Sequence, residues 1–384
     1  MSKSSAVPRG PLSAAGQMPM ISVGGRTAAA TSAPKRLSTA LADLGWGPSF
    51  QAAFEDQGLE GAVPGRVARV DRGALTVLTE AGELRAVVAA EMAHEPDPLR
   101  APTVGDWVVL HAGSVVGLLP RRSAIVRASV GGGDKPQVLA ANVDKVFVVY
   151  SLEGRFRPRR LERLLVLAWQ SGAAPVAVLT KADIATDAPG ALAAAERLIG
   201  GGDVLAVSSL TGAGMDEVCA FLEPGATVAL LGPSGAGKST LANRLGQGTI
   251  ALATGEIRND GKGRHTTTAR ELVRLPDGAM LIDTPGLRAL ALWDADEAIG
   301  EAFGEVEELA EACRFSDCGH RSEPGCALKE AIAAGTLDAE RFASFEKLRR
   351  EQRHLAARVD PRARGEQRKR YKALGKLARQ SPKR

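Results

Sequence analysis

The pattern of apolar and polar residues changes about one third of the way along the chain. Between residues 40 and 120, short apolar runs alternate with turn-forming residues such as Asp71-Arg72-Gly73 and Ala81-Gly82. Five such runs at roughly even spacing predict five short strands, which is typical of a small all-β barrel. An OB-fold fits this number of strands, and so does an SH3-like barrel. The runs are Arg66–Val70, Leu75–Leu78, Leu84–Val88, Trp107–Leu110 and Val115–Leu119.

From about residue 140, strands and helices are expected to alternate. Val143–Tyr150 is a nearly continuous apolar run rich in β-branched residues, as expected of a strand buried on both faces. Leu161, Leu165 and Ala168 recur at helical spacing, and Gly172 suits the end of that helix. The pattern predicts a doubly wound α/β domain. Its other expected elements are strands at 176–179, 204–207 and 228–231, helices at 191–199, 215–222 and 238–245, and a hairpin formed by 269–275 and 279–282.

The two ends of the chain differ from this middle part. Residues 1–38 are rich in Ser, Ala, Pro and Gly without periodicity, which predicts a disordered arm. A helical stretch is expected at 297–312, and the chain ends in a basic helical segment. No run approaches the ~20 consecutive apolar residues that a membrane helix needs, and the N-terminus lacks the apolar core of a signal peptide. We therefore expect a soluble cytoplasmic protein with no membrane partner.

Charge is distributed unevenly. The formal net charge is +5, but residues 341–384 alone carry 16 Lys and Arg against 4 Asp and Glu. Residues 1–38 carry five bases and no acid, so the body between the two ends is acidic. Basic ends favour a polyanionic partner such as nucleic acid or the ribosome. The alternative is that basic tails only aid solubility.

A phosphate-binding loop lies at residues 232–240. It reads Gly232, Pro233, Ser234, Gly235, Ala236, Gly237, Lys238, Ser239, Thr240 and matches the P-loop pattern in full, between an apolar strand and a helix. Glycines let backbone N–H groups surround phosphate oxygens, and the helix start adds partial positive charge. Lys238 is expected to neutralise the β- and γ-phosphates and Ser239 to bind Mg²⁺.

Two further segments bear on the nucleotide. Asp283-Thr-Pro-Gly286 follows an apolar strand, so Asp283 is expected near Mg²⁺ and the Gly286 N–H near the γ-phosphate. Thr180, Lys181, Ala182 and Asp183 follow another strand and correspond to the Asn-Lys-x-Asp motif of GTPases. An Asp there accepts two hydrogen bonds from guanine, which adenine cannot donate. Ser208 and Ser209, after the next strand, are expected to place backbone groups near guanine O6.

These parts occur in the order base reader, base loop, P-loop, Asp283–Gly286, and in this order the chain resembles the RsgA (YjeQ) family of circularly permuted ribosome-biogenesis GTPases. The resemblance covers roughly residues 40–375 and implies an OB barrel, a permuted GTPase domain and a zinc-containing C-terminal domain. It further implies binding to the small ribosomal subunit and its 16S rRNA late in maturation, with the subunit stimulating GTP hydrolysis to GDP. The matching segments are Leu119–Ser123, Ala141–Asp144, Arg160–Arg163, Thr180–Asp183, Gly232–Thr240, Gly263–Thr268, Asp283–Gly286 and the Cys/His cluster described below.

With this resemblance the expected domains are an arm at 1–38, an OB-fold barrel at 39–122, a permuted GTPase domain at 123–296 and a zinc-binding helical domain with a basic tail at 297–384. Thr180 departs from the more usual Asn, which removes an orienting amide while Lys181 and Asp183 are kept. A protein that binds a ribosomal subunit as a single chain is expected to be a monomer.

The catalytic residue is less obvious than the nucleotide-binding ones. Ras-like enzymes place a Gln after D-x-x-G to orient the attacking water, but Leu287 stands here. His265, beside Thr266, Thr267 and Thr268, is the candidate for that role, and the alternative is a solvated loop residue or an rRNA contact. One of these threonines is expected to bind Mg²⁺.

Cys313, Cys318, His320 and Cys326 supply three thiolates and one imidazole, a ligand set that suits a closed structural Zn²⁺ site. Cys219 stands apart and is expected in the core. Two other classes of function compete with the GTPase: an OB and zinc RNA-binding module in which nucleotide only gates binding, and a P-loop ATPase, which the base reader disfavours.

Overall fold

A computed structural model describes residues 38–95, 97–127, 136–199, 202–248, 270–283, 296–321 and 323–359. The chain divides into two units, Met1–Arg36 and Leu37–Arg384. The arm expected at 1–38 lies outside the described residues except for Ser38. Within the described part of the chain, no helix is long and apolar enough to cross a bilayer.

The five strands expected between residues 66 and 119 form a closed barrel. In the order β1–β2–β3–β5–β4, neighbours are hydrogen-bonded, and β1 also pairs with β4, which closes the ring. Pairing of β3 with β5 is parallel and the other pairings are antiparallel. This Greek-key closure is that of an OB-fold, so the topology decides between the two expected barrels. The strands are β1 (Val63–Asp71), β2 (Ala74–Thr79), β3 (Gly82–Val88), β4 (Trp107–His111) and β5 (Ser114–Leu118).

Short helices cover the barrel. On α2, the Phe50 ring packs against Trp107 of β4, and Trp46, just before the helix, meets the same ring edge-on at 4.6 Å. Burial of these aromatic rings holds the helix against the barrel. The helical segments of this region are α1 (Thr39–Ala42), α2 (Pro48–Glu55), α3 (Ala90–Ala93) and the 3-10 turn η1 (Pro98–Arg100).

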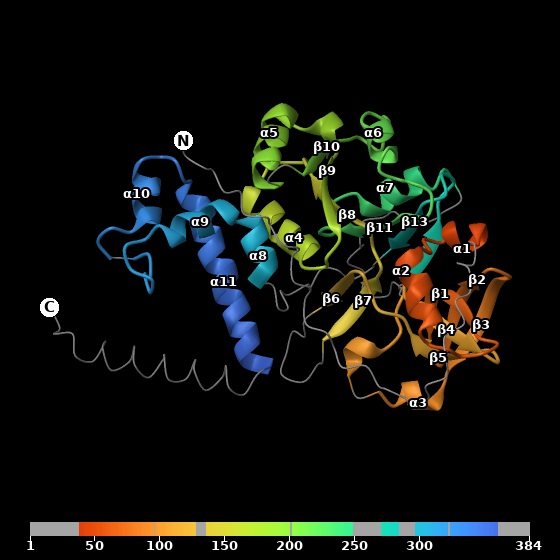
Figure 1. Ribbon diagram of the computed structural model, residues 1–384. Helices are drawn as coiled ribbons and strands as arrows, with labels where there is room; N and C mark the ends of the chain where they lie inside the picture. Colours follow the sequence, from red (N-terminus) through yellow and green to blue (C-terminus); the bar gives the residue numbers. More distant parts are fainter. Residues whose placement is uncertain are drawn as a thin grey trace, which may run out of the picture. The chain divides into compact units, whose positions relative to one another are not determined.

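The following α/β region has one sheet in the order β10–β9–β8–β11–β13–β12. All of its strands are parallel except β12, which forms the expected hairpin with β13. Figure 1 shows β8, β9, β10 and β11 side by side with α4 and α5 beside them. The strands are β8 (Lys145–Ser151), β9 (Ala174–Thr180), β10 (Asp203–Ala206), β11 (Thr227–Leu231), β12 (Glu271–Arg274) and β13 (Met280–Asp283), and the helices are α4 (Pro158–Trp169), α5 (Ala188–Ile199), α6 (Met215–Cys219) and α7 (Lys238–Leu245).

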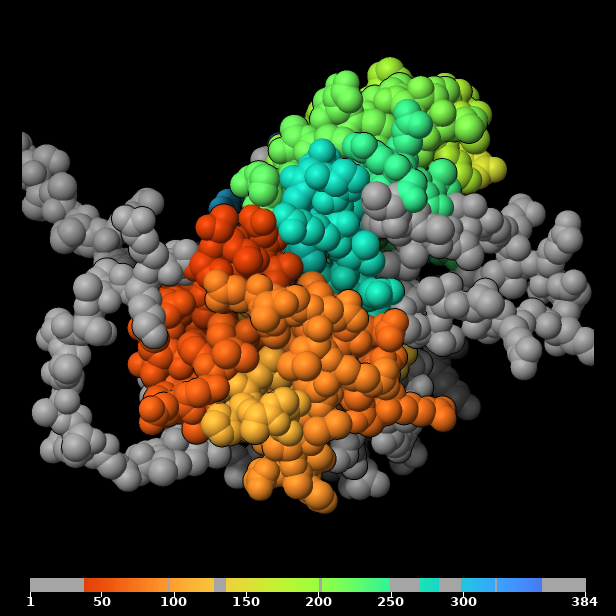
Figure 2. All heavy atoms as spheres, turned by 90° about the vertical axis from the view of Figure 1, so that its right-hand side faces the viewer, coloured from red at the N-terminus to blue at the C-terminus, as the bar shows by residue number. Residues whose placement is uncertain are grey.

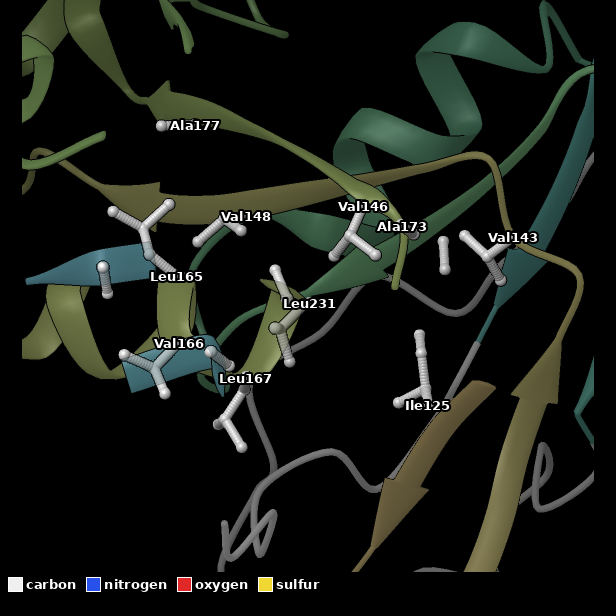
Figure 3. Close-up of a cluster of buried hydrophobic side chains, with 14 of the residues drawn as sticks. Ile125, Val143, Val146, Val148, Leu165, Val166, Leu167, Ala173, Ala177 and Leu231 are labelled. Atoms are coloured by element: carbon white, nitrogen blue, oxygen red, sulfur yellow. The ribbon is translucent and has the colours of Figure 1, made fainter. Parts of the chain in front are cut away.

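Alternate residues of each central strand point to opposite faces of the sheet. On β8, Val146 and Val148 belong to a core with α4, whereas Phe147 and Val149 belong to a second core with α6 and α7. Figure 3 shows Val148 and Leu165 in the first core, together with Leu231 of β11. Both faces of the sheet are therefore covered, as predicted for a doubly wound domain.

The barrel and the α/β sheet are continuous. Arg69 of β1 pairs with Glu271 of β12, and Arg274 of β12 forms an ion pair with Asp43 at 2.9 Å. Figure 2 shows the barrel, the N-terminal helices and the β12–β13 hairpin in contact on one face. A two-stranded sheet, β6 (Ala124–Arg127) with β7 (Gln137–Ala141), lies between barrel and α/β region in sequence and was not predicted.

The C-terminal part is helical, as expected, and its hydrophobic residues continue the α4 core. Phe303, Val306 and Leu348 are buried in the same cluster as Leu161 and Leu165 of α4. The helices are α8 (Asp296–Ala302), α9 (Gly304–Glu311), α10 (Ala327–Ala333) and α11 (Ala339–Val359).

Candidate functional site

The sheet has a topological switch point between β8 and β11. Chain order runs outward from β8 through β9 to β10 on one side, and from β11 to β13 on the other. Open α/β sheets bind ligands at such a point, beyond the carboxyl ends of the strands. The P-loop follows β11 and the predicted base reader follows β9, so the topology brings both predicted motifs to this edge.

The P-loop begins at a close backbone approach. A Cβ on Gly232 would lie 2.2 Å from the Val149 carbonyl oxygen, so only glycine allows β8 and the loop this spacing. At the other end, Gly237 has φ of 89° and is the N-cap of α7. The Lys238 ammonium group donates hydrogen bonds to the carbonyl oxygens of Gly232 (2.8 Å) and Pro233 (2.7 Å). The Lys238 side chain therefore lies across the P-loop, where its charge is expected to neutralise phosphates.

Thr180 connects the base reader to the P-loop. Its hydroxyl group donates a hydrogen bond of 2.6 Å to the Ala236 carbonyl oxygen, and its side chain is buried. The Tyr150 carbonyl oxygen lies 3.3 Å from the same hydroxyl. The Thr180 side chain thus bonds to the phosphate loop, a role that its comparison with the usual Asn does not indicate.

Lys181 and Asp183 differ in their surroundings. Lys181 has left-handed backbone angles (φ 59°, ψ 38°), which turn the chain sharply after β9. Its ammonium group pairs with Glu153, which follows β8 and belongs to no recognisable motif. The Asp183 carboxylate is exposed in the short 3-10 turn η2 (Ala182–Ile184). An exposed carboxylate beside a held lysine is an arrangement that can accept hydrogen bonds from guanine.

The base loop is fastened to the base reader by backbone hydrogen bonds. Val207 donates to Leu179, and Ala182 donates to Val207. Ser208 is buried, and its hydroxyl oxygen accepts a hydrogen bond from the Thr211 N–H at 3.2 Å. Ser209 is half-buried in the same turn. The two predicted base-contacting segments therefore form one hydrogen-bonded unit.

The chain carries these motifs in permuted order, and known proteins share that order. The sequence model of the RsgA GTPase family matches residues 118–293. The small ribosomal subunit biogenesis GTPase RsgA of Streptomyces coelicolor is 49% identical over 352 residues, which cover 88% of this chain and 95% of that protein. The chain belongs to the RsgA GTPase family.

Solved structures agree with this assignment. The crystal structure of YjeQ from Thermotoga maritima matches with a TM-score of 0.56 at 25% identity, covering 75% of this chain and 97% of that one. YloQ, described as a circularly permuted GTPase, matches in fold with a TM-score of 0.55 at 23% identity, covering 76% of this chain and 96% of that one. The expected barrel, permuted P-loop domain and helical C-terminal part are thereby confirmed, and the chain is a GTPase that uses guanine nucleotide.

The four predicted metal ligands lie together in the C-terminal part of this RsgA GTPase. Their ligand atoms are all within 4.8 Å of one another. Cys313 Sγ is 4.0 Å from Cys326 Sγ, and the His320 Nδ1 lies 3.6 Å from both sulfurs. A tetrahedral site with metal–sulfur bonds of about 2.3 Å and metal–nitrogen bonds of about 2.0 Å has sulfur–sulfur and sulfur–nitrogen separations of about 3.8 and 3.5 Å. The residues therefore fit a closed tetrahedral metal site.

The thiol of Cys313 is prepared for this role by its surroundings. Burial raises its pKa, but hydrogen bonds from the backbone N–H groups of Ala327 and Leu328 and from the Cys318 and Cys326 thiols together bring the pKa below the ordinary value. Because the thiolate is the form that binds metals, these donors at the start of α10 favour binding. Cys219, by contrast, has its pKa raised, first by burial and then by Asp277 and Asp216, and it lies half-buried against the second core, not within it as the sequence predicted.

Helix α4 contacts the C-terminal helices directly. Buried Glu162 accepts a hydrogen bond of 3.0 Å from Arg341 of α11, and Arg341 also donates to the Ala302 carbonyl oxygen at 2.7 Å. The next residue of α4 is Arg163, and its guanidinium group makes two hydrogen bonds, of 2.5 and 2.6 Å, with the Glu351 carboxylate of α11. The helix that follows the switch point is thus tied to the part that carries the metal ligands. Nothing in the sequence pattern indicated these pairs.

Several predicted residues fall outside the described part of the chain. His265, Thr266, Thr267, Thr268 and Gly286 are among them, and of Asp283 only the backbone at the end of β13 is described. The basic tail beyond Val359 is outside as well.

Proposed function

We propose that this chain acts in the assembly of the small ribosomal subunit by hydrolysing GTP while bound to that subunit. The observation that carries the nucleotide part of the proposal is the hydrogen bond from Thr180 to Ala236, which joins the base-reading loop after β9 to the phosphate loop after β11. Relatives of this chain are named small ribosomal subunit biogenesis GTPases. Subunit assembly is cytoplasmic, and so is the expected place of action.

Each part of the nucleotide has its proposed contacts. The backbone N–H groups of Gly232–Thr240 bind the α- and β-phosphates, and Lys238 neutralises charge on the β- and γ-phosphates. Ser239 and Asp283 would hold Mg²⁺, which would supply positive charge to the phosphates, and the Gly286 N–H would sense the γ-phosphate. Phosphoryl transfer needs positioning and charge neutralisation more than covalent chemistry, so these contacts account for most of the catalysis.

Recognition of the base is assigned to the segment after β9. Asp183 accepts hydrogen bonds from guanine N1–H and N2–H₂, Lys181 packs over the base, and Ser208 and Ser209 present backbone groups to O6. Competition of GDP, ADP and IDP for the site tests this assignment. GDP is expected to bind at least ~100-fold more tightly than ADP, because an adenine leaves the Asp183 carboxylate without a donor. Equal competition by ADP would contradict it.

His265 is proposed to orient the attacking water, since Leu287 occupies the position of the usual glutamine. The variant His265→Ala is expected to lower subunit-stimulated hydrolysis ~100-fold or more while GDP affinity stays the same. Unchanged stimulated turnover would show that another group positions the water.

The Cys₃His cluster is proposed to hold one structural Zn²⁺ through Cys313, Cys318, His320 and Cys326, since three thiolates with one imidazole suit zinc and leave no open position. The subunit contact is proposed to include 16S rRNA, which the basic tail beyond residue 360 favours by charge. The protein is proposed to act as a monomer.

A further inference from the structure

We propose that the exposed segment 154–160, between β8 and the first turn of α4, is a binding surface for the phosphate groups of an RNA backbone. The proposal rests on the small-subunit function given above and adds a defined contact to it. The segment reads Gly-Arg-Phe-Arg-Pro-Arg-Arg and contains four arginines and no acid. We refer to it as the arginine segment.

The four arginine side chains are exposed, and the described part of the chain leaves most of their charge unpaired. Only Arg159 has an ion pair, with Glu340 at 3.8 Å, and both of those side chains are more than half exposed. Arg155, Arg157 and Arg160 have no side-chain hydrogen bond or ion pair with any described residue. An exposed pair at that distance contributes little, so the segment keeps nearly its full positive charge.

Nearby acids are already engaged. Glu153 pairs with Lys181, Glu162 pairs with Arg341, and Asp187 accepts a hydrogen bond from the Gly190 N–H at 2.9 Å. The first turn of α4 also contains no acid. Mutual repulsion of these four cations destabilises the fold, and within the described residues only the exposed Arg159–Glu340 pair offsets it. Clusters of like charge without compensating partners are found mainly at functional positions.

The chemistry of the segment favours phosphate over other partners. Guanidinium groups form paired hydrogen bonds with phosphate oxygens, and four arginines within six residues can engage several phosphates of one strand. The one aromatic residue, Phe156, is half-buried and packs edge-on against Tyr150 at 5.4 Å, so it is not available for stacking on a base. The arginine segment therefore presents mainly positive charge. It is suited to the RNA backbone without regard to base sequence.

The arginine segment lies close to the base reader. Arg155 lines a hollow of about 470 Å³ that also includes Leu152 and Thr186. Leu152 donates a backbone hydrogen bond of 2.8 Å to Thr180, and Glu153 holds Lys181. RNA on the arginine segment is therefore two residues away from the ion pair that positions the base-reading lysine. Binding of the subunit to this surface would therefore affect the guanine site.

The test uses the full chain with Arg155, Arg157 and Arg160 all replaced by Gln. Its affinity for purified small subunits, and separately for isolated 16S rRNA, is measured by sedimentation at several salt concentrations. We expect both affinities to fall at least ~10-fold, and the slope of log affinity against log salt to decrease by about one for each arginine that contacts a phosphate. The matched control is Arg197→Gln, which removes an exposed arginine of α5. GDP affinity reports whether each variant is folded.

The outcomes separate this inference from the proposed function. Affinities and salt slopes equal to those of Arg197→Gln would overturn the inference while leaving the function intact. A loss toward subunits but not toward 16S rRNA would assign the segment to a ribosomal protein and overturn the RNA assignment. If the unaltered chain binds 16S rRNA but not subunits, and the triple variant loses that binding, the inference holds and the proposed function fails. The single variants Arg157→Gln and Arg160→Gln, expected to lose ~2- to 3-fold each, serve if the triple variant does not fold.

Discussion

Replacing Arg66 with methionine is expected to destabilise the junction between the barrel and the GTPase sheet. Arg66 lies on β1 and is fully buried. Its guanidinium group donates hydrogen bonds to the carbonyl oxygens of Leu44, Gly105 and Asn142 and to the Thr227 hydroxyl at 2.7 Å. These partners come from the N-terminal helices, the barrel, the segment before β8 and the start of β11, whose other end carries the P-loop.

The magnitude follows from two opposing effects. Four hydrogen bonds from a charged donor contribute about 1.5–2 kcal/mol each, or about 6–8 kcal/mol together. Burial, partly offset by Asp144 and Asp106, lowers the pKa of Arg66 to about 10, so its surroundings disfavour the charged form by a net of about 3 kcal/mol. A methionine of similar length loses the free energy of the hydrogen bonds but also removes the cost of burying a charge. We therefore expect the free energy of unfolding to decrease by about 3–5 kcal/mol.

Urea unfolding followed by tryptophan fluorescence is a suitable assay, because the Trp107 ring lies 5.5 Å from the Arg66 guanidinium carbon. The matched control is Arg69→Met on the same strand, whose half-exposed side chain has an ion pair only with Asp71 and is expected to cost less than ~1 kcal/mol. The free energy of unfolding of Arg66→Lys should lie between those of Arg66→Met and the unaltered chain, because an ammonium group cannot bond to four acceptors as the forked guanidinium group does. Equal stability of Arg66→Met and Arg69→Met would refute the reasoning.

Three further predictions concern the site and its support. Thr180→Val removes the hydroxyl that bonds to Ala236 and should weaken GDP binding ~10-fold, with Thr180→Ser close to the unaltered chain; a valine variant that binds GDP normally in isothermal titration would show that the tether does not position the P-loop. Cys318→Ser should reduce zinc content, measured by atomic absorption, from about one ion per chain to near zero, and an unchanged content would remove Cys318 from the ligand set. The hydrogen bonds from Arg163 lower the pKa of Glu351, so Glu351→Gln should destabilise the fold at pH 7. The difference in stability between the variant and the unaltered chain should disappear as the pH falls below about 4, where the carboxyl of the unfolded chain is protonated. A difference in urea midpoint that does not depend on pH would contradict this.

Much of the fold was predictable because it depends on local pattern. The five barrel strands and the parallel strands of the sheet each form a continuous apolar or alternating run, and most were located within two residues. The choice of an OB-fold depended on pairings between distant segments, β3 with β5 and β1 with β4, which no local pattern encodes. The β6–β7 pair was missed because each strand is short and its register is irregular.

Part of the candidate site was also predictable from local sequence, and part was not. Glycine and lysine positions in the P-loop follow from the geometry of phosphate binding and can be read from the sequence. The contact from Thr180 to Ala236, the pairing of Glu153 with Lys181 and the buried ion pair of Glu162 with Arg341 each join residues at least 28 positions apart. Arg66 shows the limit most clearly, because the local pattern predicts a strand there but does not indicate that the arginine side chain is fully buried.

The rate of GTP hydrolysis with and without purified small ribosomal subunits is the most direct test of the account. The unaltered chain is expected to turn over GTP slowly alone and at least ~10-fold faster with saturating subunits, as trans-acting groups accelerate other GTPases. Lys238→Ala, which removes the P-loop ammonium group, should abolish both rates, and large subunits should give no stimulation. A hydrolysis rate that small subunits leave unchanged would contradict a subunit-stimulated GTPase and favour a binding module in which nucleotide only gates RNA affinity.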